Sequence, residues 1–160
     1  MLDKCITCIS LSMAMFYLTA CSEARRDPCE LLTVEDVKSV DDSVAISIWA
    51  GRDGERKEDE VCVFHTKDGD PRVMLFVWYD KEKEPEQLVT NGAIDTDAII
   101  VEVPGVGSKA IATFNGDELK TFAVKSARGV VGLRVRKPVR RDSADFNDIS
   151  QLAEKALSRY

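Results

Sequence analysis

The uninterrupted apolar and aromatic run at residues 73–79 is the feature that most restricts how this chain can fold. Turn-forming residues precede it at 67–71, and charged residues follow it at 80–84. A run of this length between turn signals predicts a strand, and the lack of alternation is typical of a strand covered on both faces. We therefore expect a central strand at 72–79, with a helix packed on at least one side.

Further strands and helices are predicted around this central strand. The first helix is expected at 31–40, with Thr33 as its N-cap and acidic residues in its first turn. A short helix starts near Pro85, and a long C-terminal helix is capped by Ser143 and carries one apolar face. A charged run at 55–60 predicts a solvated loop. Apolar or alternating segments predict further strands at 44–49, 61–66, 99–103, 109–114, 119–125 and 130–136.

Hairpin turns join many of these strands. Asn115-Gly116 and Arg128-Gly129 are turn sequences between neighbouring strands. Strands joined by hairpins pair antiparallel, whereas a doubly wound nucleotide-binding fold needs a helix between successive parallel strands. We therefore predict the α+β class, with a mainly antiparallel sheet, helices packed on it and a long C-terminal helix.

The charge-free segment at 5–20 has the length of the apolar region of a signal peptide. It is too short to span a membrane comfortably, which takes about 20 apolar residues. It leads into Leu-Thr-Ala-Cys at 18–21, which resembles the lipobox of bacterial lipoproteins, where the cysteine becomes the first mature residue and carries the lipid. We expect a signal peptide at 1–20, a tether at 21–27 and a single domain at 28–160. An uncleaved anchor helix and an ordinary secretory signal are the alternatives.

Lipidation of Cys21 would place the domain at a membrane surface, because several acyl chains together give stable anchoring. The expected location is the cell envelope, with the domain facing the periplasm or the exterior. In bacterial lipoproteins a residue such as Ser22 after the cysteine is associated with sorting to the outer membrane. An outer-membrane location is therefore expected if the cell is Gram-negative.

The five cysteines differ in their expected roles. Cys5 and Cys8 lie in the expected signal peptide and Cys21 is the expected lipid site, which leaves Cys29 and Cys62 in the domain. Export brings these two into an oxidising compartment, where disulfides persist. Closing a loop of about 33 residues would contribute roughly 3.5–4 kcal/mol in the chain-entropy model. A Cys29–Cys62 disulfide is therefore predicted, with two separate buried thiols as the alternative.

Several short motifs of the mature chain resemble one group of exported proteins. They are Pro-Cys-Glu-Leu-Leu-Thr at 28–33, Cys62 followed by Phe64, and the segments at 103–110 and 152–159. The chain is similar in these motifs to small actinobacterial lipoproteins of unknown function and to extracellular sensor domains of mycobacterial receptor kinases. The resemblance implies the same disulfide and an antiparallel sheet that carries helices. It implies no catalytic residues.

The sequence contains no set of side chains typical of a catalytic or metal centre. His65 is the single histidine, and no Gly-x-Ser-x-Gly turn is present to offer it a serine nucleophile. Two cysteines and one histidine are too few for the four ligands of a structural zinc site. The carboxylate pairs fall short of the oxygen count of a calcium loop; they are Asp53/Glu55, Asp68/Asp70 and Asp95/Asp97. We expect no catalytic residues, metal or cofactor, and the alternative is an envelope hydrolase that uses a carboxylate pair.

The chain is acidic overall but carries one basic cluster. A net charge of −6 argues against nucleic acid as a partner, because that affinity comes from cations that contact phosphates. The basic cluster consists of Arg134, Arg136, Lys137, Arg140 and Arg141. It suits contact with anionic lipid headgroups or cell-wall polymer, or it protects a solvated edge strand against aggregation.

The anchor, the predicted disulfide and the missing catalytic set together favour a non-enzymatic domain. We expect it to bind an unidentified envelope protein or a small ligand, as a sensor or an accessory protein, while a lipid on Cys21 holds it at the membrane. A purely structural lipoprotein without a ligand is the remaining alternative.

Overall fold

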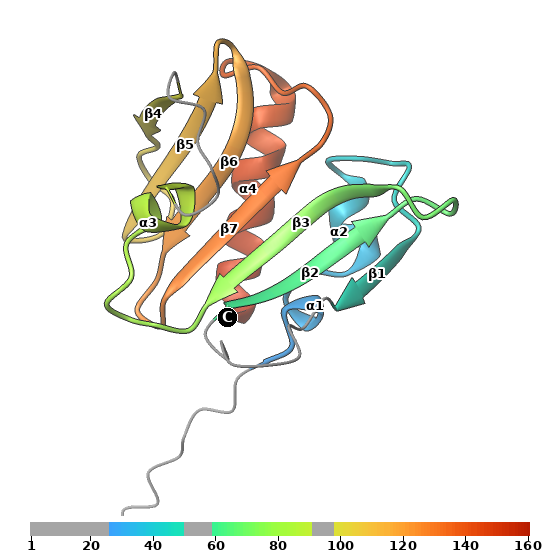
Figure 1. Cartoon of the computed structure of the whole chain (residues 1–160), viewed down its shortest axis with the longest axis horizontal. Coiled ribbons are helices and arrows are strands. Elements are labelled where there is room, and N and C mark those ends of the chain that lie inside the picture. Colours follow the sequence, from blue (N-terminus) through green and yellow to red (C-terminus); the bar gives the residue numbers. More distant parts are fainter. Residues whose placement is uncertain (1–25, 50–58, 91–97) are drawn as a thin grey trace, which may run out of the picture.

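One antiparallel sheet forms the centre of the molecule. The computed structural model describes residues 26–49, 59–90 and 98–160. Its strands are β1 (Ile46–Trp49), β2 (Asp59–His65), β3 (Pro71–Trp78), β4 (Ile99–Glu102), β5 (Lys109–Asn115), β6 (Glu118–Lys125) and β7 (Val130–Val135). They form a seven-stranded sheet in the order β1-β2-β3-β7-β6-β5-β4 (Figure 1).

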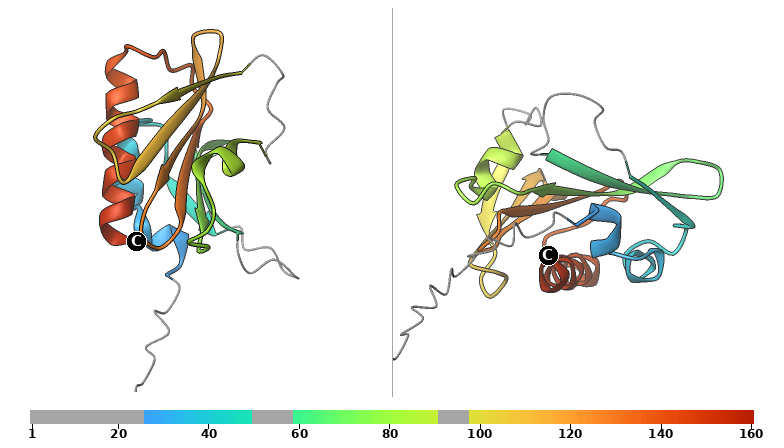
Figure 2. Two further views of the ribbon diagram at one scale, coloured as in Figure 1. Left: turned by 90° about the vertical axis from the view of Figure 1, so that its left-hand side faces the viewer. Right: turned by 90° about the horizontal axis from the view of Figure 1, so that it is seen from below.

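Helices lie on both faces of this sheet. In the described ranges they are α1 (Pro28–Leu31), α2 (Val34–Lys38), α3 (Pro85–Thr90) and α4 (Ala144–Arg159). Figure 2 shows α1, α2 and α4 on one face, which we name the helix side, and α3 on the opposite face, which we name the α3 side. The fold is therefore α+β with a mainly antiparallel sheet and a long C-terminal helix, as the sequence predicts.

Two meanders make up the sheet. The strands β1, β2 and β3 pair in chain order, and so do β4, β5, β6 and β7. The two meanders join where β3 pairs with β7, from Val73 opposite Val135 to Trp78 opposite Val130. β3 is therefore an inner strand, as its apolar sequence predicts. β2 begins at Asp59, so the end of the charged run at 55–60 is strand instead of loop.

The N-terminal helical segment differs from its prediction. Instead of one helix over 31–40, the structure has α1 and α2, with Leu32 extended between them (φ −133°, ψ 135°). Thr33 and Asp36 form a capping box at the start of α2: Thr33 N donates to Asp36 Oδ2 (2.9 Å), and Asp36 N donates to Thr33 Oγ1 (3.2 Å). A capping residue needs a non-helical backbone. The Thr33 cap therefore excludes Leu31 and Leu32 from the helix that it begins.

The main core lies between the sheet and the helices α1, α2 and α4. Alternate strand residues such as Phe64, Leu75 and Leu133 point to the helix side and are fully buried there. α4 packs along these residues with its apolar face, whose side chains recur at the helical spacing that the sequence predicts. The residues that α4 buries are Ile149, Leu152, Ala153 and Ala156, with Phe146 and Leu157 partly buried.

A disulfide joins the first helix to the sheet. Cys29 of α1 and Cys62 of β2 are bonded through their Sγ atoms, with a Cα–Cα distance of 5.1 Å. This is the pairing that the sequence predicts. Asp27, the N-cap of α1, accepts a hydrogen bond from Cys29 N (2.7 Å). The start of the domain is therefore a capped helix that one covalent bond fixes to β2.

An ionic cluster ties α2 to the C-terminal end of α4. The Asp36 side chain is 8% exposed and pairs with Lys155 Nζ (2.6 Å) and with Arg159 Nη1. Arg159 Nη1 also donates to the carbonyl of Leu31 (3.1 Å). Burial by itself would raise the pKa of Asp36, but the hydrogen bonds from Lys155, Thr33 and Arg159 outweigh burial and hold this pKa well below its usual range.

The Asp36 cluster predicts acid-sensitive stability. Because the pKa of Asp36 is lower in the folded than in the unfolded state, its contribution is present above the unfolded pKa of about 3.9 and is lost as the pH falls toward the folded pKa. Asp36→Asn should therefore lower the free energy of unfolding by about 1.5–3 kcal/mol at pH 7. It should also lose less stability than the unmodified chain between pH 4 and pH 2, as measured by urea unfolding.

The control is Asp42→Asn, which changes an exposed aspartate in the turn after α2. This variant should keep both the stability at neutral pH and the acid sensitivity of the unmodified chain. Equal acid sensitivity of Asp36→Asn and the unmodified chain would contradict the assigned role of the cluster.

Candidate binding surface

The α3 side of β1, β2 and β3 carries apolar side chains in register. Directly paired residues of antiparallel strands point to the same face. One row across the strands is Ile48, Val63, Met74 and Arg134, and the next is Val61, Phe76 and Gly132. Phe76 packs against the cluster that contains Leu88 of α3, which places both rows on the α3 side. We name the apolar surface the open face, and its residues are Ile46, Ile48, Val61, Val63, Met74 and Phe76.

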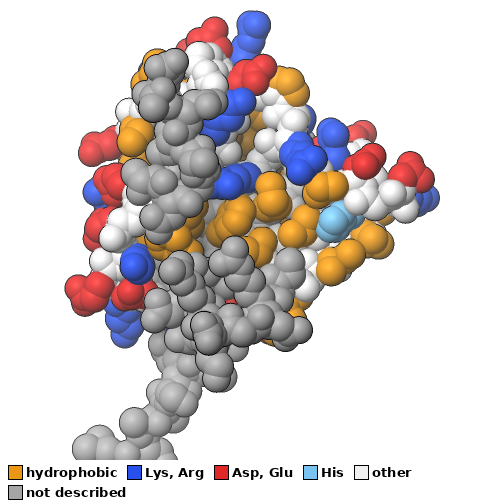
Figure 3. Space-filling model, in the orientation of Figure 1, with side chains coloured by type: hydrophobic (Ala, Val, Ile, Leu, Met, Phe, Trp, Pro, Cys, Tyr) orange, Lys and Arg blue, Asp and Glu red, His pale blue; other side chains and the backbone are white. Residues whose placement is uncertain are grey.

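The open face is in contact with solvent. Ile46 and Ile48, on the edge strand β1, are 43% and 49% exposed. The open-face residues of β2 and β3 are partly exposed. Figure 3 looks onto the α3 side and shows hydrophobic side chains gathered over β1, β2 and β3. Single exposed apolar residues are common on protein surfaces, but a group of them is typical of an interaction site.

The open face corrects the prediction that β3 is covered on both faces. Leu75 and Val77 are fully buried on the helix side, but Met74 and Phe76 on the α3 side remain partly exposed. The physical reason is the size of α3, which has 6 residues and is about 9 Å long. A helix of this length covers about two strand spacings of about 4.8 Å. It therefore leaves the β1 end of the sheet uncovered by any described element.

α3 covers the neighbouring area of the same face, over β5, β6 and β7. Its buried residue Leu88 belongs to a second apolar cluster, with Trp78, Ile111, Ala123 and Val130. Gly132 allows the close approach, because a Cβ at this position would lie 2.8 Å from Leu88 Cδ2. The helix therefore rests directly on the backbone of β7.

The α3 segment also brings carboxylates to lysines of the sheet. Lys109 Nζ lies 2.5 Å from Glu86 Oε1 and 3.6 Å from Glu84 Oε2. Lys125 Nζ lies 3.1 Å from Glu84 Oε1 and donates to the carbonyl of Lys81 (2.6 Å). The hydrogen bond from Lys109 holds the pKa of Glu86 below its usual range. Leu88 and the carboxylates of Glu84 and Glu86 thus cover part of the chain's own sheet.

Arg134 is the cation beside the open face. Its Nε donates to Thr121 Oγ1 (3.1 Å), and its Cζ lies 5.0 Å from the centre of the Phe76 ring. Burial lowers the pKa of Arg134, which means that its charge is partly desolvated. In the described part of the chain, no carboxylate forms an ion pair with it. A desolvated guanidinium held in one orientation suits an incoming carboxylate.

The structure divides the predicted basic cluster. Arg134 contacts the open face, whereas Lys137 Nζ pairs with Asp145 Oδ1 of α4 (2.9 Å). The remaining members are exposed to solvent: Arg136, Arg140 and Arg141. The cluster therefore supplies one cation that touches the open face and one that is already neutralised.

The other candidate residues lie in turns or outside the described ranges. His65 ends β2, and its Nδ1 donates to the carbonyl of Gly69 (2.9 Å). Asp68 and Asp70 are exposed in the turn between β2 and β3. Among the described residues, no group of three or more His, Cys, Asp or Glu side chains is placed to hold a metal ion. The residues that lie outside the described ranges are Cys21, Asp53, Glu55, Asp95 and Asp97.

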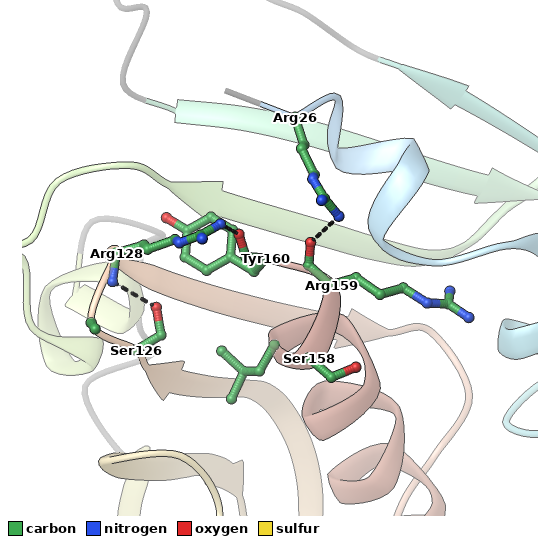
Figure 4. Close-up of a pocket in the computed structure, with 8 residues that line it drawn as sticks. Arg26, Ser126, Arg128, Ser158, Arg159 and Tyr160 are labelled. Atoms are coloured by element: carbon green, nitrogen blue, oxygen red, sulfur yellow. Dashed lines mark hydrogen bonds between the residues drawn. The ribbon is translucent and has the colours of Figure 1, made fainter. Parts of the chain in front are cut away.

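A pocket of about 310 Å³ lies at the C-terminal end of α4 (Figure 4). Arg26, Arg128 and Arg159 are among its lining residues, and each of the three arginines bonds to the protein itself. Arg26 Nη1 donates to the carbonyl of Arg159 (2.7 Å), and Arg128 Nη1 donates to the carbonyl of Tyr160. The Arg159 side chain points away from the pocket and binds Asp36. The hydrogen bonds in this pocket therefore hold the two ends of the domain together. Because its arginines are already paired, the pocket is a weaker candidate than the open face.

Comparison with known proteins assigns no family to this chain. No protein-family model, no curated protein and no solved structure matches it. None of the helices in the described residues is long and apolar enough to cross a membrane.

Sequence reasoning missed the open face, although part of its signal is visible. Positions 46 and 48, 61 and 63, and 74 and 76 are all apolar. The residues between them in β2 and β3 are mostly apolar too, so the pattern matches a strand covered on both faces. Only the strand order and the length of α3 reveal which area stays uncovered.

A polar substitution on the open face should cost little stability. Ile48→Thr keeps a β-branched side chain and removes apolar area that is already 49% exposed, so we expect a change within about 0.5 kcal/mol. Leu75→Ala, on the buried side of the same sheet, should cost about 2–5 kcal/mol. Urea unfolding of both variants measures the difference. A loss above about 2 kcal/mol for Ile48→Thr would place the open face in the folding core.

Proposed function

We propose that this chain is a lipid-anchored cell-envelope protein whose domain binds a partner through the open face, without catalysis, as a sensor or an accessory protein. The observation that carries this proposal is a row of exposed and partly exposed apolar side chains that ends at Arg134, whose guanidinium lies over the Phe76 ring. Apolar contact area with an arginine anchor is a typical composition of protein binding surfaces. Such a surface contributes little to the stability of the isolated domain.

The lipid anchor belongs to the same proposal. The charge-free segment and the Leu-Thr-Ala-Cys motif support a lipid on Cys21. Arg26 is attached to the domain through two hydrogen bonds. Its side chain donates to the carbonyl of Arg159, and its backbone carbonyl accepts from the Tyr79 hydroxyl. An extended chain from Cys21 to Arg26 reaches at most about 18 Å. A lipid on Cys21 would therefore keep the domain close to the membrane surface.

The alternatives need other features. A hydrolase needs two carboxylates that converge in a pocket, and the described pair Asp68 and Asp70 lies in an exposed turn. A purely structural lipoprotein needs no exposed apolar surface. The open face therefore favours the binding function over both alternatives.

Removal of Cys21 should release the domain from the membrane. The Cys21→Ala variant lacks the thiol that carries the lipid, and the acyl chains provide the anchoring energy, about 0.8 kcal/mol per buried methylene. We expect no incorporation of an alkyne-labelled fatty acid and a shift of the domain to the soluble fraction. Cys8→Ala, which changes another cysteine of the leader, should keep both properties. A Cys21→Ala chain that stays fully membrane-bound without lipid would favour the uncleaved anchor helix.

A photoreactive residue on the open face should capture a partner in the intact envelope. We expect the full chain with p-benzoylphenylalanine in place of Ile48 to give a discrete crosslinked product under ultraviolet light. The matched control carries the same residue in place of Glu154, which is exposed on α4. Identical products from both positions, or none from position 48, would contradict binding through the open face.

A further inference from the structure

The open face and the area under α3 are two parts of one sheet surface. α3 covers the area over β5, β6 and β7, and the open face lies over β1, β2 and β3. Phe76 belongs to both areas, because it packs against the cluster of Leu88 and also lies under Arg134. The side chains with which α3 covers its area of the sheet therefore indicate which side chains could cover the open face.

The contacts of α3 provide this chemical template. Leu88 fills the space above Gly132, while Glu84 and Glu86 neutralise Lys109 and Lys125. The α3 segment thus covers the sheet with Leu88 facing the strands, one carboxylate (Glu86) in the first turn of the helix and another (Glu84) directly before it. This arrangement matches a helix docked in a groove, with apolar anchors and charged flanks.

The open face has the features that α3 covers elsewhere on the sheet, namely apolar strand residues with cations beside them. Its apolar rows reach Arg134 on β7, and Arg136 follows two positions later. Arg136 N donates to Arg72 O (2.8 Å), so the ladder continues beyond β7 and both arginines point to the α3 side. In the described ranges no carboxylate pairs with either of them. The open face thus presents apolar area and cations, and no acidic helix among the described elements lies over them.

We infer that the open face receives an acidic amphipathic helix of a partner protein, whose apolar side chains cover Ile48, Val63 and Met74 and whose carboxylate pairs with Arg134. This inference rests on the proposed binding function and adds the chemistry of the partner. Charge complementarity selects an acidic partner, although the chain itself carries a net charge of −6.

The shape of the α3 side favours a single helix over a flat membrane. α3 stands out from the sheet next to the open face (Figure 2). A planar bilayer that approaches this side would meet α3 before it reached the apolar rows. Arg134 is also held within the sheet by Thr121 and Phe76, so it does not extend toward distant headgroups.

A second copy of the chain is also a poorer occupant than an acidic helix. A symmetric dimer places the same surface patch on both sides of its interface. Two open faces would therefore bring their arginines together without supplying carboxylates, and like charges across an interface are unfavourable.

The test uses the full lipidated chain in phosphatidylcholine nanodiscs, with labelled Ile and Met methyl groups observed by NMR. The probe is a synthetic helical peptide with leucines on one face and glutamates beside it. We expect the methyl signals of Ile48 and Met74 to shift and saturate with this peptide, and to stay unchanged with a peptide that carries lysines in place of the glutamates. Arg134→Gln should weaken binding of the glutamate peptide about tenfold, because it removes a charged hydrogen-bonded pair.

Two variants serve as controls in the same experiment. Arg141→Gln removes an exposed cation from the loop before α4 and should leave the affinity unchanged. Ile48→Gln should weaken binding while the other methyl signals keep their positions, which shows that the variant is folded.

Four results would overturn the inference. They are no shift at millimolar peptide, equal shifts with the glutamate and lysine peptides, the same shifts caused by phosphatidylglycerol nanodiscs without peptide, and shifts that depend on protein concentration alone. The third result would assign the face to a lipid surface and the fourth to a second copy. If a crosslinked partner at position 48 persists in the envelope while the peptide test fails, the proposed binding function stands and only the partner chemistry is wrong.

Discussion

The pairing of β3 with β7 is the constraint on which the rest of the structure depends. It joins two meanders that form from local hairpins, although α3 and three other strands separate β3 from β7 along the chain. Closing such a long loop costs conformational entropy before any contact is gained. Burial offsets this cost, because Val73, Leu75, Val131 and Leu133 of the two strands are fully buried on the helix side.

The same pairing makes the two faces of the sheet unequal. Once the meanders form one sheet of seven strands, its width is about 30 Å at 4.8 Å per strand. The chain places α1, α2 and α4 on one face but only α3, about 9 Å long, among the described elements on the other. The open face is therefore the area that this helix cannot reach, while the inner strands β2 and β3 remain packed on their opposite side.

Local patterns predicted the features whose physical causes are local. Thr33 and Ser143 cap helices because their hydroxyls accept from nearby backbone amides, and Gly116 takes the positive φ of 57° that its hairpin turn requires. The β3–β7 pairing and the uncovered face depend on residues far apart in the chain, which no local pattern encodes. The run at 73–79 looks the same whether a face is covered by this chain or by another molecule. For the same reason, the sequence predicted Arg134 as part of a basic cluster but not its position over Phe76.

A surface of this kind can be selective for its partner without binding it at high affinity. Two partners confined to one membrane meet at a high effective concentration, so for a domain anchored through Cys21, as we propose, a modest affinity is sufficient. The apolar rows then supply contact area, and Arg134 orients the bound partner. Its contacts with Thr121 and Phe76 fix the guanidinium before a partner arrives. At a distance, the net charge of −6 repels acidic proteins. Only a partner that presents its carboxylates to this one face gains from the local reversal of charge, and this reversal is the physical basis of the proposed specificity.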